Sequence, residues 1–362
     1  MIHIFMIGMS KDKGGVEAYI SNVCNQLTQK YEVVYCLPHM EISGTAWDCP
    51  PNRHNYVRYY HFWTRFFRKN HFDVLYYNTC DIVSIDMLRF AKAAGIPVRI
   101  IHSHNTDNQL KMTLFHRITE KINRAELHRY ATHLFACSQN AGEWMFGKRE
   151  FTLIQNGILL RRYEYSEQSG EDCRNMISIE NCILVGCVGR LDPQKNPLFT
   201  IEIAKELCHI VPNLHLVMIG DGELRAQVAE TIVRYGIAER VHLLGARDDV
   251  YRWYSAFDCL LMPSLFEGLP FVLVEAQAAG LPCVVSDAVS HEANITGLLE
   301  YVSLEKSPRE WAEIAWRACQ KTRQNTTQKL IDAGYSIENT ATQVSKIIET
   351  AMGKRHDKKS HS

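Results

Sequence analysis

The amino-acid sequence predicts an α/β protein that consists of two doubly wound, parallel-sheet domains. Short apolar runs alternate with helix-patterned stretches along the whole chain. These runs are rich in Val, Ile and Leu and do not alternate with polar residues, which is typical of parallel strands covered by helices on both faces. The series also starts again in the second half, and 362 residues are enough for two domains of ordinary size.

Each half contains five runs that we expect to form strands. In the first half they lie at residues 2–7, 32–37, 74–77, 98–102 and 133–136, and in the second half at 183–188, 215–219, 241–243, 259–262 and 283–286. Amphipathic segments between these runs predict helices, among them 15–29, 197–208 and 225–235. Strands that alternate with helices in this way imply parallel sheets.

The domain boundary is expected where this pattern is interrupted. Residues 161–170 carry no apolar periodicity, so we predict an N-terminal domain over 1–165 and a C-terminal domain over 166–336. A last periodic helix, 337–352, is expected to pack back on the N-terminal domain. The polar tail at 353–362 is predicted to be disordered.

The composition excludes several classes of protein. The 40 basic residues balance the 40 acidic ones, so we expect no nucleic-acid partner. No uncharged apolar run approaches the ~20 residues of a membrane-spanning helix, and the first run lacks the features of a signal peptide. The 12 cysteines show no Cys-x-x-Cys spacing, which favours buried free thiols in a reducing cytoplasm over disulfides or metal sites.

The first segment with a chemical signature follows the expected strand at 183–188. Gly189 ends this strand, Arg190 and Lys195 lie in the next loop, and a helix is expected to begin with Asn196 as N-cap and Pro197 as its first residue. Ligands of parallel sheets bind beyond the carboxyl ends of the strands. Arg190 and Lys195 are therefore candidates to bind phosphate oxygens, although two solvated surface cations fit the spacing equally well.

The second segment follows the expected strand at 259–262. Pro270 marks the start of a helix that ends near Ala279, and Gly280 takes the position after it. Glu267 lies in the loop before this helix, where the free backbone N–H groups of the first turn would face an anion. Glu275 lies inside an otherwise apolar helix, so its carboxylate must form an ion pair or accept hydroxyl hydrogen bonds.

The ordered motifs of the second half resemble those of the retaining GT-B glycosyltransferases of family 4. In chain order they are Gly189-Arg190-Leu191 with Gln194-Lys195-Asn196, Gly220-Asp221-Gly222, Leu244-Gly245, and Glu267-Gly268-Leu269-Pro270 with Glu275. The two glutamates, eight positions apart, are similar to the E-x7-E signature of that family. In the first half, Gly14-Gly15-Val16-Glu17 and His102-Ser103-His104-Asn105 are similar to the branch that builds capsules and exopolysaccharides.

This resemblance implies a GT-B architecture, with the two domains facing each other across a cleft, and it assigns roles to individual residues. Arg190 and Lys195 would bind the diphosphate of a nucleotide sugar, and Glu275 would accept hydrogen bonds from the ribose hydroxyls. Glu267 and the backbone amides of Gly268 and Leu269 would hold the sugar hydroxyls.

For the first half, the resemblance implies that Gly15 lets the backbone approach the phosphates, and that His104 lies beside the transferred sugar. The catalytic residues are then expected to be His104, Glu267, Arg190 and Lys195. The chain departs from the common family pattern at Asn196, where Gly is frequent, and at Leu269-Pro270, where Phe-Gly is frequent. Neither departure removes a charged group, so both bear on the choice of sugar.

The implied reaction moves a sugar from a nucleotide sugar, with a UDP-sugar favoured by the family, to a hydroxyl of a glycan or a polyprenyl-linked sugar. The resemblance also implies retention of configuration. The chain contains no Asp-x-Asp motif, so we expect no metal cofactor. Three alternatives remain open: a GT-B-like nucleotide-sugar epimerase, a dinucleotide oxidoreductase, and an inactive subunit that only binds the nucleotide sugar.

A basic first half suggests contact with an anionic membrane. Residues 1–160 carry 18 lysines and arginines against 13 carboxylates. Two stretches, 61–72 and more weakly 111–124, mix aromatic and basic residues at helical spacing, and such segments can lie on an anionic bilayer. This would suit an enzyme at the inner face of the cell membrane, but an ordinary helix with one apolar face and solvated bases fits the same spacing.

Overall fold

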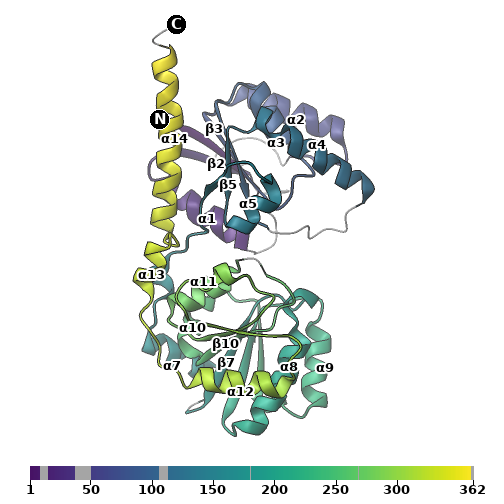
Figure 1. Ribbon diagram of the computed structural model, residues 1–362, viewed down its shortest axis with the longest axis vertical. Coiled ribbons are helices and arrows are strands. Elements are labelled where there is room, and N and C mark those ends of the chain that lie inside the picture. The colour runs from purple at the N-terminus through teal and green to yellow at the C-terminus, as the bar shows by residue number, and fades with distance from the viewer. Residues whose placement is uncertain (9–14, 37–49, 106–112, 180, 268, 360–362) are drawn as a thin grey trace. The chain divides into compact units, whose positions relative to one another are not determined.

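The computed structural model describes residues 1–8, 15–36, 50–105, 113–179, 181–267 and 269–359. The chain divides into two compact units: unit 1 comprises Met1–Ile158 and Ser336–Ser362, and unit 2 comprises Leu159–Tyr335. Each unit contains a six-stranded parallel sheet between two layers of helices (Figure 1). The predicted α/β fold class, with two doubly wound parallel sheets, is confirmed.

The sheet of unit 1 has the strand order β2-β1-β3-β4-β5-β6. Its strands are β1 (His3–Ile7), β2 (Glu32–Cys36), β3 (Val74–Thr79), β4 (Val98–Ser103), β5 (His133–Ala136) and β6 (Thr152–Leu153). The five expected strands are present, and the two-residue edge strand β6 is too short to give an apolar run. The order changes direction between β1 and β3, which is the switch point of this sheet.

Two helices cover one face of this sheet, α1 (Gly15–Leu27) and α14 (Ile337–Lys359), and they pack against each other. The other face is covered by α2 (Tyr56–Lys69), α3 (Asp86–Ala93), α4 (Leu114–Tyr130) and α5 (Gln139–Phe146) (Figure 1). Helix α14 continues to Lys359, into the tail that we predicted to be disordered from residue 353. Lysine and arginine are good helix formers, and a single glycine at 353 costs only about 1 kcal/mol in a helix.

The sheet of unit 2 has the order β12-β11-β10-β7-β8-β9. Its strands are β7 (Ile183–Val188), β8 (Leu214–Ile219), β9 (Val241–Gly245), β10 (Cys259–Met262), β11 (Cys283–Ser286) and β12 (Leu299–Val302). The unexpected strand β12 contains Glu300 and lies at the sheet edge, which explains why no apolar run marks it. The switch point of this sheet lies between β7 and β10.

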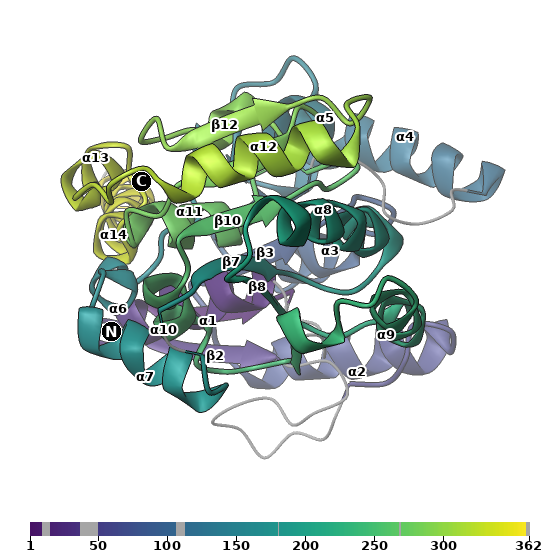
Figure 2. The same ribbon diagram turned by 90° about the horizontal axis from the view of Figure 1, so that it is seen from below.

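Helices α8 (Pro197–Ile210), α9 (Arg225–Arg234) and α12 (Pro308–Cys319) pack on one face of the second sheet (Figure 2). The opposite face carries α7 (Glu167–Met176), α10 (Val250–Ala256) and α11 (Phe271–Ala278). Unit 2 begins at Leu159, earlier than the expected boundary at 165/166, because the short helix α6 (Leu160–Tyr163) packs on α10 and α11.

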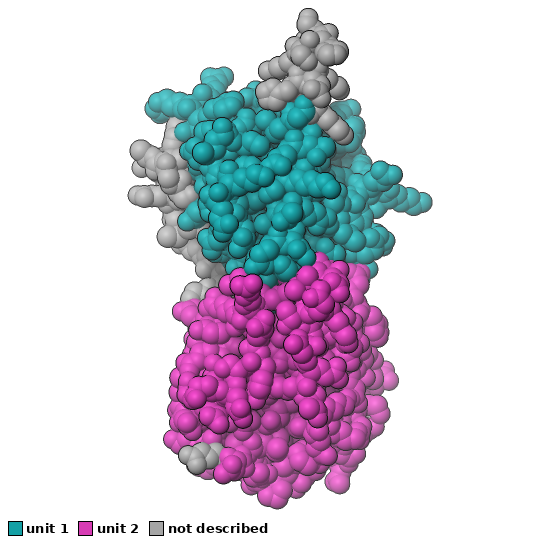
Figure 3. All heavy atoms as spheres, turned by 90° about the vertical axis from the view of Figure 1, so that its left-hand side faces the viewer, with its two compact units in different colours: residues 1–158, 336–362 teal, residues 159–335 magenta. Residues whose placement is uncertain are grey.

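The chain leaves unit 1 after Ile158 and returns to it at Ser336, and these two segments lie side by side. Ile158 and Ser336 form a parallel bridge, and the Ile337 N–H donates to the Ile158 carbonyl at 3.0 Å. Figure 3 shows the resulting division, with the described part of the segment that starts at Ser336 coloured as unit 1. Unit 2 is thus an insertion between β6 and α14 of unit 1.

The first two strands of unit 2 come very close where they end. Gly220, which follows β8, has a φ of +140°, and a Cβ at this position would lie 1.9 Å from the carbonyl oxygen of Gly189 after β7. Only glycine satisfies both the conformation and the contact. This close approach fixes the positions of the loops that follow β7 and β8.

We therefore expect Gly220→Ala to lower the free energy of unfolding by about 3 kcal/mol or more, since backbone strain adds to a clash with main-chain atoms. Gly236→Ala is the matched control. Gly236 has a φ of +68° but nothing within 4 Å of its would-be Cβ, so only about 1–2 kcal/mol should be lost. Urea unfolding of the two variants measures the difference, and equal losses would show that the contact at Gly220 is unimportant.

Candidate active site

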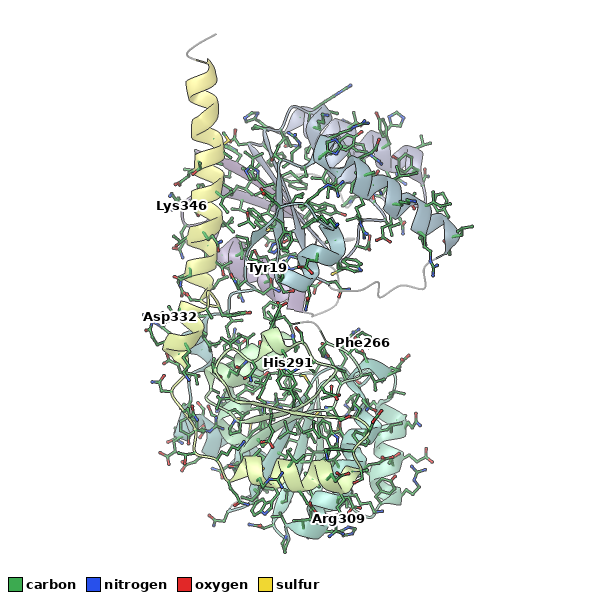
Figure 4. All side chains as sticks on the ribbon, in the orientation of Figure 1. Tyr19, Phe266, His291, Arg309, Asp332 and Lys346 are labelled. Carbon is green, nitrogen blue, oxygen red and sulfur yellow. The ribbon has the colours of Figure 1, made fainter. Side chains whose placement is uncertain are left out.

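The switch point of unit 2 brings together the two segments that the sequence singled out. The loop after β7 and the loop after β10 leave the sheet at neighbouring strands. The Leu265 N–H donates to the Gln194 carbonyl at 2.8 Å, and the Gln194 side chain donates to the Phe266 carbonyl at 3.2 Å. These hydrogen bonds hold the two loops as one surface, on which the side chain of Phe266 is exposed (Figure 4).

An ion pair between Lys195 and Glu267 joins the same loops. The side chains of Lys195 and Glu267 are only 18% and 9% exposed, so each charge depends on the other for compensation. Arg190 lies nearby in sequence but is 64% exposed, and it pairs with Asp192 at 3.2 Å. Asp192 also accepts the Lys195 N–H at 3.1 Å and so caps the turn that carries the lysine.

A small hollow lies at the carboxyl ends of β7 and β10. Arg190, Lys195 and Ser264 are among the residues that line it. The hydroxyl oxygen of Ser264 is buried and has no hydrogen-bond partner among the described residues. A buried donor without a partner is costly, and here it faces a hollow beside two cations. At about 10 Å³ the hollow has room for little more than one water molecule, so it could take a single oxygen atom of an anion.

Asn196 explains one of the departures from the family pattern. It adopts the left-handed conformation with a φ of +54°, which glycine reaches most easily and asparagine next most easily. It is the N-cap position of α8, as expected, but its side chain does not cap that helix. The side chain instead donates to the Pro263 carbonyl at 3.2 Å, which adds another link between the two loops.

Glu275 lies on α11 with both carboxylate oxygens hydrogen-bonded. Tyr163 donates to Oε1 at 2.9 Å, and Tyr254 donates to Oε2 at 2.6 Å. Burial raises the pKa of Glu275, and the two tyrosine hydrogen bonds oppose that rise. Burial and the nearby carboxylate also raise the pKa of both tyrosines, so they remain protonated donors. Each carboxylate oxygen can still accept a further bond from a ligand.

The remaining expected residue of this loop, Leu269, is half-buried, while Gly268 lies outside the described residues. Pro270 occupies the N-cap position of α11, where we expected the helix to start. The first-turn amides of an α-helix have no partner within the helix. They are therefore available to an anion or a hydroxyl oxygen.

Gly15 and His104 belong to unit 1, whereas all the residues above belong to unit 2. Gly15 is the first residue of α1 and is exposed. His104 follows β4, and its Nε2 lies 2.9 Å from Oδ1 of Asn78 at the end of β3. Because the Asn78 amide donates to the Ile7 carbonyl, the network assigns the proton to Nε2 of His104. Burial lowers the pKa of His104 to about 3.

A buried chain of hydrogen bonds orients His102, whose ring packs against His104. Tyr19 of α1 (Figure 4) and Tyr76 of β3 have hydroxyl oxygens 2.8 Å apart, and the Tyr76 hydroxyl lies 3.0 Å from Nδ1 of His102. The ring of His102 packs on that of His104, with centroids 4.0 Å apart. Burial and the neighbouring His104 lower the pKa of His102 well below its ordinary range. Both imidazoles are therefore neutral at pH 7.

Sequence reasoning missed the partners that position these groups. They are Ser264, Tyr163 and Tyr254 in unit 2, and Tyr19, Tyr76 and Asn78 in unit 1. None of them lies within a recognisable motif, and the fold brings each one next to a partner that is distant in sequence. Among the described residues, no three metal-ligating side chains gather into one group. No helix in that part of the chain is long and apolar enough to cross a membrane.

Comparisons with known proteins identify the family to which the chain belongs. The profile of Glycosyltransferase Family 4 matches residues 13–162, and that of Glycosyl transferases group 1 matches residues 183–320. The chain is 31% identical over 278 residues to EpsF of Bacillus subtilis (strain 168), a protein named as a glycosyltransferase. That alignment covers 74% of this chain and 72% of EpsF.

Two further proteins are similar over different extents. The UDP-Gal:alpha-D-GlcNAc-diphosphoundecaprenol alpha-1,3-galactosyltransferase of Escherichia coli is 34% identical over 38% of this chain and 37% of its own length. The crystal structure of HepE from Anabaena in complex with UDP-glucose superimposes with a TM-score of 0.70 at 18% identity, over 99% of this chain and 100% of that one. With two such α/β units and these relatives, the chain belongs to glycosyltransferase family 4 and has the GT-B fold.

Proposed function

We propose that this glycosyltransferase takes its sugar from a UDP-sugar and transfers it, with retention of configuration and without a metal ion, to a lipid-linked glycan. The observation that carries the proposal is the nearly buried pair of Lys195 and Glu267 at the switch point of unit 2. A cation and a carboxylate held there offer one group for a leaving diphosphate and one for sugar hydroxyls.

Lys195 and Arg190 would stabilise the diphosphate. Negative charge builds on the leaving group as the bond to the anomeric carbon breaks, and fixed cations in a partly dry site act strongly on such charge. Lys195 has three N–H donors, of which the bond to Glu267 uses one. Its other donors and the Ser264 hydroxyl can bind phosphate oxygens, so these residues would do what a metal ion does in metal-dependent transferases.

Glu275 would accept hydrogen bonds from the ribose hydroxyls. Its carboxylate is already oriented by Tyr163 and Tyr254, so little conformational entropy is lost when the ribose binds. Glu267 and the amides at the start of α11 would hold the transferred sugar. Gly15 would allow the backbone of unit 1 to approach the diphosphate.

His104 would act as a neutral hydrogen-bonding group beside the sugar. Its depressed pKa makes a cationic imidazolium unsuitable as the resting form at pH 7. The leaving phosphate itself would then take the proton of the acceptor hydroxyl, on the same face of the sugar from which it departs. This front-face course gives retention.

The acceptor is proposed from the Escherichia coli relative, whose name specifies a sugar on diphosphoundecaprenol as its substrate. The same class of acceptor would place this enzyme at the cytoplasmic face of the cell membrane, in the assembly of a capsule or exopolysaccharide. The named relatives are transferases, and nothing in the site favours the alternative of an epimerase.

The proposal is tested by UDP binding and by the stereochemistry of the product. UDP at 100 times its Kd should raise the free energy of unfolding by about 2.7 kcal/mol, and EDTA should not change this gain. Lys195→Met should raise the Kd about 10- to 100-fold, because it removes a charge-assisted hydrogen bond. Glu267→Gln should keep UDP binding within about threefold but lower the transfer rate about a hundredfold.

Arg309→Ala, a substitution of an exposed residue on α12, is the control for both variants and should change neither quantity. A UDP effect that requires metal, or that survives Lys195→Met, would contradict the assigned site. A product whose anomeric configuration is inverted, as seen by NMR, would contradict the mechanism.

Glu275→Gln should separate binding of the ribose from binding of the diphosphate. We expect about tenfold weaker binding of UDP, since a carboxylate acceptor is lost, and unchanged binding of inorganic diphosphate. Titration calorimetry with both ligands measures this difference, and the exposed Glu313→Gln on α12 is the matched control. Equal weakening for both ligands would show that Glu275 does not contact the ribose.

The neutral state of His104 makes a prediction about pH. The folded pKa of about 3 lies below the ordinary value of 6.5, so the unfolded chain binds a proton more readily between these values. This histidine's contribution to stability is thus complete above pH 6.5 and falls by up to about 1.4 kcal/mol per pH unit below it. When the pH is lowered from 7 to 5, the free energy of unfolding of His104→Asn should fall by roughly 2 kcal/mol less than that of the wild type. Urea unfolding at the two pH values measures this difference. An identical loss would contradict the assignment.

A further inference from the structure

The aromatic and basic stretch at 61–72 proves to be an ordinary helix and its following turn. Trp63, Phe66 and Phe67 of α2, together with Phe72, are buried and pack around Phe5 of β1. Their rings form the core of unit 1 and are not accessible to a bilayer. The basic residues of this stretch are solvated, as in the simpler of the two interpretations that the sequence allowed.

Helix α4 shows the opposite arrangement, with large apolar side chains facing solvent. Leu114, Phe115, Ile118 and Ile122 are 76%, 70%, 50% and 50% exposed. At about 100° per residue these four positions lie within one stripe of roughly 100°. Asn123 and Leu127, on the other side of the helix, are buried against unit 1. Soluble proteins rarely expose so contiguous an apolar surface without a use for it.

The orientation of α4 is fixed by polar contacts on its inner side. The Asn123 amide donates to the carbonyls of Ile82 and Val83 at 2.9 and 3.0 Å, and Arg89 donates to the Asn123 side-chain oxygen at 2.9 Å. Both views of the ribbon show the helix extending past its neighbours α2 and α3 in unit 1 (Figures 1 and 2). The apolar stripe therefore cannot turn inward without breaking this network.

The charges next to the stripe are positive. Arg117 and Lys121 are exposed and lie along one edge of it. The two carboxylates of the helix are engaged in ion pairs, Glu120 with Arg124 at 2.6 Å and Glu126 with Arg89 at 3.3 Å. An apolar face bordered by cations complements a surface that is apolar inside and anionic at its boundary.

We propose that the outer face of α4 binds the surface of an anionic phospholipid bilayer, with Leu114, Phe115 and Ile118 inserted among the lipids and Arg117 and Lys121 at the headgroups. The inference builds on the proposed lipid-linked acceptor and names the surface that would bring the enzyme to it. The helix lies in the plane of the membrane boundary and does not cross it.

Flotation of the full chain with phosphatidylcholine vesicles, with and without phosphatidylglycerol, tests this inference. The wild type should float with the anionic vesicles and not with the neutral ones. The triple variant L114S/F115S/I118S and the double variant R117Q/K121Q should each bind the anionic vesicles about tenfold or more weakly. Val233→Ser, which removes a similarly exposed apolar side chain from α9 of unit 2, is the control and should float as the wild type does.

Equal flotation of the wild type and both variants would overturn the inference, as would equal binding to neutral vesicles. Sedimentation of the same proteins tests whether the α4 face binds a second copy of the chain. A wild type that is dimeric, together with a triple variant that is monomeric, would show that it does and would overturn the inference. UDP-induced stabilisation, measured on every variant, should be unchanged. A wild type that floats but does not bind UDP would contradict the proposed function alone, and one that binds UDP but does not float would contradict only this inference.

Discussion

A parallel sheet that is covered by helices on both faces leaves its chain accessible to ligands only at the strand ends. In unit 2 the helix after β7, α8, packs on one face of the sheet, whereas the helix after β10, α11, packs on the other. The loops that lead to these helices must therefore diverge from neighbouring strands. Lys195 and Glu267 lie on these two loops, and their ion pair links the loops where they diverge. Arg190 lies on the first of these loops, and Glu275 lies on the helix to which the second loop leads, so both positions follow from this divergence.

The buried charges of the site are oriented before any ligand arrives. Glu275 accepts hydrogen bonds from two tyrosine hydroxyls, and the charges of Lys195 and Glu267 compensate each other. A group that is already fixed in position loses little entropy on binding and needs little reorganisation as charge develops. The two imidazoles of unit 1 are also oriented in advance, although they carry no charge: His102 shares a hydrogen bond with Tyr76, and His104 donates one to Asn78.

Sequence patterns identified the groups that carry charge but not the groups that position them. The strands before Gly189 and Pro263 were predictable because they are uninterrupted apolar runs, and Glu275 was conspicuous because it interrupts an apolar helix. Tyr163 and Tyr254 were not predictable, since an aromatic residue at helical spacing is usually part of the core. The same ambiguity affected the two aromatic and basic stretches: the sequence favoured 61–72 over 111–124 as a membrane segment. Leu114 and Ile118 also have the spacing of a buried face, and the inward position of Asn123 shows that they point outward. Strand β6 was missed because it has only two residues, and β12 was missed because Glu300 interrupts its apolar run.

The insertion of unit 2 between β6 and α14 has a consequence for the order of synthesis. When the ribosome has made β1 to β6, the sheet of unit 1 still lacks the helix that covers half of one face. Val344 and Ile348 of α14, both fully buried in the finished protein, are translated only after all of unit 2. Unit 2 can complete its own core as a continuous segment, as domains generally do during synthesis. Unit 1 is thus begun before unit 2 and completed after it, and part of its apolar surface remains uncovered until unit 2 has been translated.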